Sequence, residues 1–483
     1  MVARRASRWG FASLFAALIG CEADPPRVLE DPLDADAASH GPVDTADVAT
    51  LPLLPIAAEV ETLQVAESDL APYPLHEVLE VVTVDSGTDE DTPPARFPRP
   101  SMVRGLYVNA WAAGSRTRME VLLDLARRTE VNSLVIDIKD ATGYVSHRTE
   151  VPLAHEIGAT EEIRIRDLPA LLAWLEAEGI YPIARIVVVK DPILTEFRPE
   201  FAVQDTAGGV WVDAKGSTWL SPYSTEVWDY HVEIAREVAG LGFPEIQWDY
   251  VRFPDAPRAD LDRAVFEGAD GRTKATVIRD GLRRAREGLS DLNVQMTADV
   301  FGVTTSARRD VGIGQLWESF IDVVDVALPM VYPSHYWEGS FGVTMPNTRP
   351  YEIVKHALTD AVRRSQLVNG AGRTRPWLQA FSLGEPHYGA PEIRAQIQAT
   401  YDAGIDEWVL WNPASRYTEA ALEPVGGFDR DPIVRVAGVL VPVSRRWTVL
   451  DSVAALTAPV DPAGTEAILA PGDGVAADTI PGH

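Results

Sequence analysis

From residue 103 onward, short apolar runs alternate with amphipathic segments along the chain. Runs of four to eight apolar residues predict buried strands, and apolar residues at helical spacing predict helices. The predicted strands are 103–111, 133–140, 181–189, 246–254, 293–302, 325–332, 375–382 and 407–413. The predicted helices are 116–129, 166–179, 224–242, 274–289, 313–323, 350–365, 391–403 and 415–422. Each strand is therefore followed by one helix.

Eight successive βα units indicate an α/β protein built as a closed (β/α)8 TIM barrel. An open doubly wound sheet usually has fewer strands and a glycine-rich first turn. No GxGxxG motif follows the first strand, so the sequence shows no dinucleotide-binding fingerprint. We place the barrel at 101–425, which exceeds the roughly 250 residues typical of this fold. The excess is expected in the loops that follow the strands.

The first 21 residues have the pattern of a bacterial lipoprotein signal peptide. Arg4, Arg5 and Arg8 precede a short apolar stretch, and the sequence Leu-Ile-Gly-Cys, which ends at Cys21, resembles a lipobox. Such an apolar stretch is too short to span a bilayer. We expect lipidation of Cys21 and a lipid anchor in the membrane of a bacterial cell envelope. A chance cysteine in an ordinary signal peptide is the alternative.

Two further segments flank the predicted barrel. Residues 22–100 form an acidic, proline-rich linker, and residues 426–483 form a C-terminal extension that is rich in alanine, proline and glycine at its end. Such compositions bury too little apolar surface to offset the entropy of ordering the chain. We therefore expect a disordered N-terminal tether and a largely disordered C-terminal tail.

Composition and motifs exclude several classes of function. A net charge of -28 argues against nucleic acid as a partner, because affinity for phosphates comes largely from Lys and Arg. The single cysteine excludes an intrachain disulfide. The sequence contains neither HExxH nor GxSxG, which disfavours a zinc hydrolase and a serine hydrolase. We expect no cofactor and no metal, with a metal held by Asp137 and Asp140 as an alternative.

Polar side chains interrupt the predicted strands near their C-terminal ends. Strands of a parallel barrel are usually apolar on both faces, and active sites of this fold lie at the C-terminal ends. We therefore predict one ring of polar groups around one cleft. Asp137 and Lys139 are two residues apart, so we expect them to point the same way. The predicted substrate-binding residues are Asp137, Lys139, Arg185, Arg252, Tyr332, Gln379, Trp411 and Asn412.

Asp249 and Asp299 are the predicted catalytic residues. They end neighbouring strands, so the fold places two carboxylates at similar height near one mouth. Like charges held close together raise one pKa, which separates a protonated acid from an ionised partner. Glycoside hydrolysis requires such a pair. The alternative is that these residues are structural: Asp137, Lys139 and Arg185 form a buried network, and Asp249 and Asp299 have no catalytic role.

Several ordered motifs resemble one known family. They are "VRGLYVNAWAAGS", "NSLVIDIKDATGYV", "IYPIARIVVVKDPIL", "IQWDYVRFP", "TADVFG", "PMVYPSHY" and "VLWNP". Together they resemble the glycoside hydrolase-like DUF4015 family, which implies a TIM barrel related to α-amylase-type enzymes. By position, the resemblance makes Asp249 the nucleophile and Asp299 the general acid/base. The chain departs from those relatives in having Asp, one methylene shorter than Glu, on the fifth strand.

The sequence thus leads to two hypotheses. The first is a lipid-anchored glycoside hydrolase that cleaves a cell-envelope or environmental polysaccharide with retention of configuration. The second is a non-catalytic barrel that binds glycan or scaffolds an envelope assembly. Fold alone does not fix activity. The hydrolase hypothesis requires that Asp249 and Asp299 share a solvent-reaching cleft, and the non-catalytic hypothesis does not.

Overall fold

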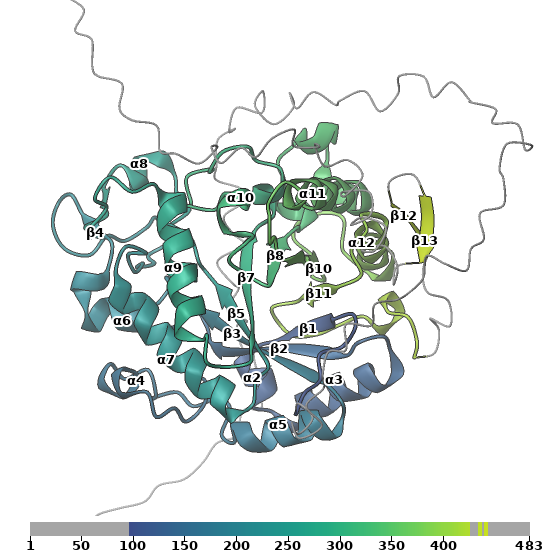
Figure 1. The fold of residues 1–483 in the computed structure, drawn as a ribbon, viewed down its shortest axis with the longest axis horizontal. Helices are drawn as coiled ribbons and strands as arrows, with labels where there is room; N and C mark the ends of the chain where they lie inside the picture. The colour runs from purple at the N-terminus through teal and green to yellow at the C-terminus, as the bar shows by residue number, and fades with distance from the viewer. Residues whose placement is uncertain (1–95, 426–432, 437–438, 443–483) are drawn as a thin grey trace, which may run out of the picture.

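A computed structural model describes residues 96–425, 433–436 and 439–442 of the chain. The predicted signal peptide with Cys21 and almost all of the predicted linker lie outside the described residues, as does most of the C-terminal extension. Within that extension, β12 (Ile433–Val436) and β13 (Val439–Pro442) pair as an antiparallel hairpin. Figure 1 shows this hairpin beside α12 (Ala390–Asp402).

Eight parallel strands close into a barrel, which confirms the predicted fold (Figure 1). The first strand pairs with the last, so no barrel strand is left with a free edge. A ninth short strand, β9 (Arg373–Thr374), pairs with the sixth barrel strand. The barrel strands are β1 (Arg104–Val108), β2 (Ser133–Lys139), β3 (Tyr181–Val187), β5 (Glu245–Asp249), β7 (Gln295–Phe301), β8 (Val326–Met330), β10 (Trp377–Gln379) and β11 (Trp408–Trp411).

Helices surround the barrel and connect successive strands (Figure 1). Side-chain caps fix where several of them begin: Ser115, Asp167 and Thr273 each accept a hydrogen bond from a backbone N–H of the first turn. Gly179, with φ 67°, follows the end of the second long helix, as the sequence predicts. The longer helices are α3 (Arg116–Arg128), α5 (Leu168–Ala177), α7 (Thr225–Leu241), α9 (Lys274–Gly288), α11 (Pro350–Ser365) and α12.

Short elements occupy the loops of the barrel. The helices among them are α2 (Ala110–Ala113), α4 (Pro152–Glu156), α6 (Pro192–Phe197), α8 (Arg258–Leu261) and α10 (Trp317–Phe320). The strands β4 (Gln204–Asp205) and β6 (Ala264–Val265) pair antiparallel. A typical barrel of this fold has ~250 residues. Many of the additional residues of this chain lie in these loop elements, as the length predicts.

Several predicted elements extend beyond the observed ones, among them the following three. The strand predicted at 246–254 ends at Asp249, because Tyr250 adopts φ 52°, which turns the chain out of the sheet. The helix predicted at 313–323 shrinks to α10, since Gly312 and Gly314 hold positive φ at its expected start. The helix predicted at 415–422 is only a 3₁₀ turn at Glu419–Ala421.

The barrel interior along β5 is polar, whereas its outer side is apolar. Ile246 and Trp248 are fully buried in the hydrophobic core, and the intervening residues Glu245, Gln247 and Asp249 make polar contacts inside the barrel. Alternate residues of a strand point to opposite faces. This alternation explains how a buried strand carries three polar side chains.

A charged cluster closes the N-terminal end of the barrel. Nη1 of the fully buried Arg375 donates to Glu245 Oε1 at 2.6 Å, and its Nε donates to Glu407 Oε2 at 3.0 Å. Burial works against ionisation of Glu407, but the positive charge of Arg375 and of two further arginines lowers its pKa overall. The N-terminal end is thus occupied by ion-paired side chains, and the remaining polar groups lie toward the C-terminal end.

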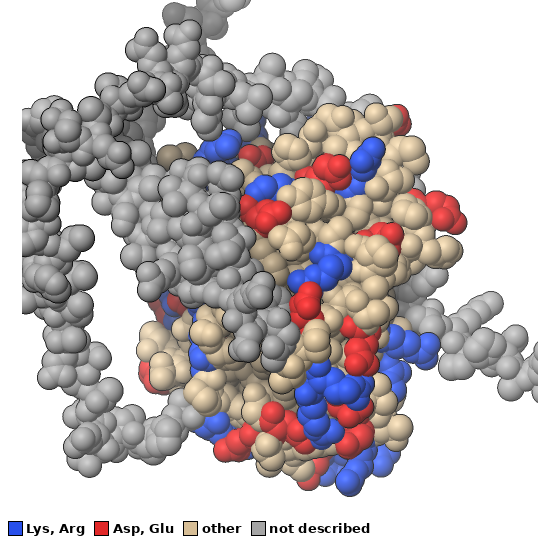
Figure 2. Space-filling view, turned by 90° about the vertical axis from the view of Figure 1, so that its right-hand side faces the viewer, with Lys and Arg blue, Asp and Glu red and all other residues tan. Residues whose placement is uncertain are grey.

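Acidic and basic side chains mix on the described surface. Figure 2 shows Lys and Arg interspersed with Asp and Glu on one face, without a continuous basic stripe there. Within the described residues, no helix is long and apolar enough to cross a membrane.

Candidate active site

Arg185 on β3 lies at the centre of the predicted polar ring. Its Nη1 donates to Asp137 Oδ1 at 2.6 Å, and its Nε donates to Asp249 Oδ2 at 2.9 Å. The same Nε lies 3.7 Å from Asp299 Oδ2. All four side chains are buried. The structure therefore brings both predicted catalytic carboxylates and two predicted binding residues into one cluster.

Asp299 on β7 is held by two further donors from inside the barrel. Trp377 Nε1 donates to its Oδ1 at 2.7 Å, and Gln247 Nε2 donates to its Oδ2 at 3.1 Å. Burial raises the pKa of Asp299 well above its usual range, and the negative charge of Asp249 raises it further. Arg185 opposes this shift without cancelling it. Asp299 is therefore a carboxyl that favours its protonated form.

Asp137 on β2 is the third carboxyl of the cluster. The Tyr107 hydroxyl donates to its Oδ2, and Arg185 occupies its Oδ1. Burial raises the pKa of Asp137 to about 6, although the charge of Arg185 pulls it down. The cluster thus has three carboxyls around one guanidinium, and burial disfavours full ionisation of two of them.

Two stacked aromatic rings lie beside the guanidinium of Arg185. The rings of Tyr107 and Trp411 stack at 3.9 Å with an interplanar angle of 27°. The guanidinium carbon of Arg185 lies 5.1 Å from the Trp411 ring and 5.6 Å from the Tyr107 ring, within cation–π range. The predicted residue Trp411 therefore belongs to the cluster through its contact with Arg185.

The predicted catalytic and substrate-binding residues do not include Tyr107, Gln247 or Trp377, although Gln247 is one of the polar residues that interrupt the predicted strands. Gln247 lies two residues before Asp249 on one strand, and Trp377 lies two residues before Gln379 on another. Residues two apart face the same way. A prediction that also included the residue two positions before each predicted site residue would have contained both Gln247 and Trp377.

Lys139 does not join the cluster, so the expectation that it points the same way as Asp137 is wrong. Asp137 pairs in register with Arg185, but Lys139 pairs with the very next residue, Ile186, because β2 contains a bulge between them. The fully buried Lys139 instead places its Nζ 2.8 Å from Asp191 Oδ2. The bulge moves this cation away from the carboxylate cluster.

Three other predicted binding residues use their side chains to shape loops. Gln379 Oε1 accepts hydrogen bonds from the N–H and the hydroxyl of Ser334. Asn412 Nδ2 donates to the carbonyl of Ala380 at 2.7 Å. Tyr332 is buried, and its ring packs edge-on against Phe381. Their contact with a substrate stays a prediction.

Arg252 lies just beyond the C-terminal end of β5. Its guanidinium carbon is 4.4 Å from the ring of Phe301, 4.9 Å from that of Tyr250 and 5.0 Å from that of Trp219. Phe301 ends β7, two residues after Asp299. The predicted residue Arg252 therefore lies at the C-terminal end of the barrel, beside the ends of the two strands that carry the catalytic candidates.

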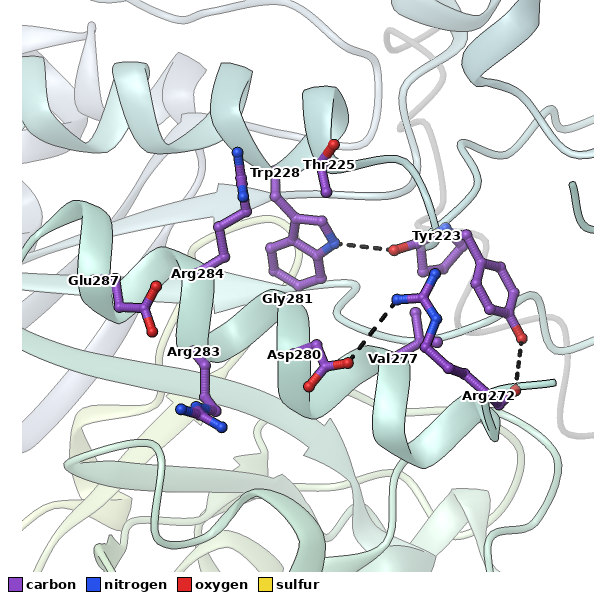
Figure 3. A pocket seen from close by; sticks show the side chains of 11 residues that line it. Tyr223, Thr225, Trp228, Arg272, Val277, Asp280, Gly281, Arg283, Arg284 and Glu287 are labelled. Carbon is purple, nitrogen blue, oxygen red and sulfur yellow. Dashed lines mark hydrogen bonds and ion pairs between the residues drawn. The ribbon is translucent and has the colours of Figure 1, made fainter. Parts of the chain in front are cut away.

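A pocket of about 230 Å³ lies elsewhere, in the outer helical layer (Figure 3). Figure 3 shows the Trp228 indole of α7 next to Gly281 of α9, with the paired Arg272 and Asp280 at one side. None of its lining residues is a predicted site residue. This pocket is separate from the carboxylate cluster.

Asp137 and Asp140, the two residues of the alternative metal site, contact different partners. Its carboxylate contacts Arg164 and the Thr142 hydroxyl, whereas Asp137 contacts Tyr107 and Arg185. In the part of the chain that the structure describes, no group of three or more His, Cys, Asp or Glu could hold a metal ion.

Comparison with known proteins gives one family match. Residues 105–417 match the family model DUF4015, described as "Putative glycosyl hydrolase domain". The match covers more than half of the chain and nearly all of the barrel. No curated protein matches the chain.

Solved structures resemble the chain only loosely. A hypothetical protein from Ruminiclostridium thermocellum is 39% identical, with a TM-score of 0.37, over 40% of this chain and 97% of that chain. The PgaB (BpsB) glycoside hydrolase domain from Bordetella bronchiseptica is 15% identical, with a TM-score of 0.48, over 65% of this chain and 95% of that chain. The spore cortex-lytic enzyme SleL from Bacillus cereus is 12% identical, with a TM-score of 0.37, over 67% and 74%.

Proposed function

Because the chain belongs to the DUF4015 family of glycosyl hydrolase domains, we propose that it is a retaining glycoside hydrolase acting on a polysaccharide. Asp249 is the nucleophile and Asp299 is the general acid/base. The cell-envelope or environmental origin of the substrate, and a lipid anchor at Cys21, belong to the same proposal. They are supported by the lipobox-like sequence before Cys21, which lies outside the described residues.

One observation carries the proposal: Asp249 and Asp299 lie against the same atom of Arg185. Since Arg185 Nε is 2.9 Å from one Oδ2 and 3.7 Å from the other, the two oxygens are separated by at most the sum of these distances, about 6.6 Å. Retaining enzymes hold their carboxyls about 5–5.5 Å apart, and inverting enzymes about 6.5–9.5 Å. The upper limit of about 6.6 Å on the distance between the two oxygens supports retention, because almost all of the distances typical of inverting enzymes exceed it.

The surroundings of the two carboxyls support different roles. The raised pKa of Asp299 favours the protonated form that a general acid needs. Asp249 instead receives Arg185 Nε on Oδ2 and the Tyr250 N–H on Oδ1. Hydrogen bonds to both oxygens fix the orientation of the Asp249 carboxyl.

The reaction then follows two steps. Asp249 attacks the anomeric carbon while Asp299 gives its proton to the glycosidic oxygen, which leaves as an alcohol. In the second step Asp299 takes a proton from water, whose oxygen displaces Asp249 from the sugar. Both carboxyls return to their starting forms, and the sugar keeps its configuration.

Screening for turnover tests the proposal directly. The full chain, in detergent, is incubated with a panel of envelope and plant polysaccharides, and new reducing ends are measured beside the Asp249→Asn variant. The expected result is release of reducing ends from at least one polysaccharide by the wild type and not by the variant. Equal release by both proteins would contradict the assigned nucleophile.

The second candidate, a non-catalytic glycan-binding barrel, is favoured by a different observation. Asp249 and Asp299 are only 3% and 1% exposed, and Arg185 supplies a counter-charge to both. A buried ion-pair network can hold a fold together without chemistry. Glycan binding by the wild type without any release of reducing ends would select this candidate.

A further inference from the structure

Arg252 differs from the other buried arginines of the described chain. Arg104, Arg164, Arg185 and Arg375 are also buried, and each forms an ion pair with a carboxylate. Arg252 is only 3% exposed, yet no carboxylate of the described residues forms an ion pair with it. In a chain of net charge -28, a buried cation without a carboxylate partner needs an explanation.

The contacts of Arg252 leave most of its donors free to bind something else. A guanidinium has five N–H donors. Among the described residues one acceptor takes a hydrogen bond from it, the carbonyl of Phe253 at 3.2 Å from Nη1. The rings of Trp219, Tyr250 and Phe301 hold the guanidinium in place. Ring faces stabilise the charge but do not accept hydrogen bonds in the guanidinium plane.

Arg252 is also close to the proposed reacting groups. It follows Asp249 by three residues, and the Phe301 ring beneath it is two residues beyond Asp299 on β7. Asp299 and Phe301 face the same side of that strand. Arg252 therefore lies nearer the C-terminal end of the barrel than Asp299, by about one layer of side chains.

A second cation lies against the same rings. Lys190, which follows β3, places its Nζ 5.5 Å from the ring of Trp219 and 5.5 Å from that of Tyr250. Lys215 lies within electrostatic reach: burial lowers its pKa, Asp255 raises it, and the charge of Arg252 lowers it further. Two positive side chains, Arg252 and Lys190, thus lie against the same rings, and a third, Lys215, lies within electrostatic reach of Arg252, with Asp255 as a nearby carboxylate.

We propose that Arg252 binds a carboxylate substituent on the glycan, so that the substrate is an acidic polysaccharide. This inference rests on the proposed function. A planar carboxylate accepts two parallel N–H donors from a guanidinium, which neutral sugar hydroxyls cannot do with the same charge. Trp219 and Tyr250 hold the guanidinium from the sides, and Lys190 adds positive charge. Two sources fit this chemistry: a uronic acid residue, and the lactyl carboxylate of a peptidoglycan sugar whose stem peptide has been removed.

Binding without turnover tests the inference separately from hydrolysis. The full chain carrying Asp249→Asn is titrated with alginate, polygalacturonate, hyaluronan and peptidoglycan fragments, each beside its carboxyl-reduced counterpart. We expect at least one acidic polymer to bind ten times or more tighter than its reduced form. The polymer that binds identifies the source of the carboxylate. Absence of any carboxyl-dependent binding would overturn the inference.

Substitution of Arg252 then assigns the binding to this residue. In the Asp249→Asn background, Arg252→Met should weaken binding of the acidic polymer tenfold or more, and Arg252→Lys should restore part of it. Arg236→Met is the matched control, because Arg236 pairs with Asp291 on the outer face of α7. Equal losses for Arg252→Met and Arg236→Met would overturn the inference.

Two outcomes separate this inference from the proposed function. Carboxyl-dependent binding by Asp249→Asn, with no cleavage by the wild type, would contradict the hydrolase and keep the acidic glycan as ligand. Cleavage of neutral and acidic forms at equal kcat/KM would keep the hydrolase and overturn the inference. Dextran sulfate serves as a further probe: binding as tight as that of the carboxylated polymer would overturn the preference for a carboxylate.

Discussion

The Oδ2 atoms of Asp249 and Asp299 lie 2.9 and 3.7 Å from one atom, Nε of Arg185. One guanidinium therefore serves two carboxyls from adjacent strands, and its Nη1 serves a third, Asp137. Because the negative charge of Asp249 raises the pKa of Asp299, a change at Asp249 alters the protonation of Asp299.

Replacing Asp249 by Asn should abolish glycan cleavage and leave the fold intact. The amide keeps the shape of the side chain but cannot attack the anomeric carbon as a carboxylate does. We expect kcat to fall by about 10⁴ or more, since a covalent step is lost. Reducing-end release gives the rate and circular dichroism the fold. A folded variant with wild-type turnover would remove Asp249 from the mechanism.

Replacing Asp299 by Asn should have an effect that depends on the leaving group. Loss of a general acid typically lowers the rate by 10²–10⁴. An aryl glycoside with a good leaving group needs little protonation, so its first step should be nearly preserved. The basic limb of the pH–rate profile, which the raised pKa of Asp299 sets, should disappear. Equal losses for aryl and alkyl glycosides would contradict the role of acid.

Replacing Arg185 by Met should destabilise the protein most at neutral pH. The change leaves Asp137, Asp249 and Asp299 buried together without a counter-charge, and breaking a buried ion pair costs about 3–5 kcal/mol. Protonation of the carboxyls at pH 5 should recover part of this loss. Urea unfolding at pH 5 and pH 7.5 measures the difference.

Arg375→Met is the matched control for that experiment. Arg375 is fully buried between Glu245 and Glu407 at the opposite end of the barrel. Its loss should destabilise the fold by a similar amount, about 3–5 kcal/mol, but the pH–rate profile of the remaining folded enzyme should keep its shape. A profile changed by Arg375→Met as by Arg185→Met would show that Arg185 has no special link to the reacting groups.

The Asp137 carboxyl should make stability fall as pH rises. Burial raises its pKa from 3.8 to about 6, so between these values the folded protein holds a proton that the unfolded chain has released. Stability from this group is complete below about pH 4 and lost above about pH 6, with a total on the order of 3 kcal/mol. The free energy of unfolding of the wild type minus that of Asp137→Asn should decrease across this window. A difference that stays constant with pH would contradict the raised pKa.

The sequence predicted the barrel because each strand is a distinct apolar run followed by an amphipathic helix. It also predicted Asp249, Asp299, Asp137 and Arg185 near one another, since strand ends in a parallel barrel share one rim. These four residues do form one cluster. Which chemistry they perform stays a prediction, because proximity does not assign a role.

Other features depend on local backbone geometry that apolar patterns do not encode. Nothing in "SLVIDIKD" marks the bulge that separates Lys139 from Asp137. The left-handed conformation of Tyr250, which ends β5 early, is rare for a residue with a side chain. The contacts of Gln379 and Asn412 with neighbouring loops arise from tertiary packing. A pattern along one strand carries no information about such partners.

The bulge in β2 has an electrostatic consequence for the whole barrel. In a regular strand, the ammonium group of Lys139 would face inward beside Asp137 and supply a second positive charge to the acids there. With that lysine bound to Asp191 instead, Arg185 alone pairs with the three carboxyls among the described residues, two cations fewer than their full ionisation would require. A proton on one of the carboxyls can take the place of a missing positive charge. The one extra residue in β2 therefore favours a protonated carboxyl at the site.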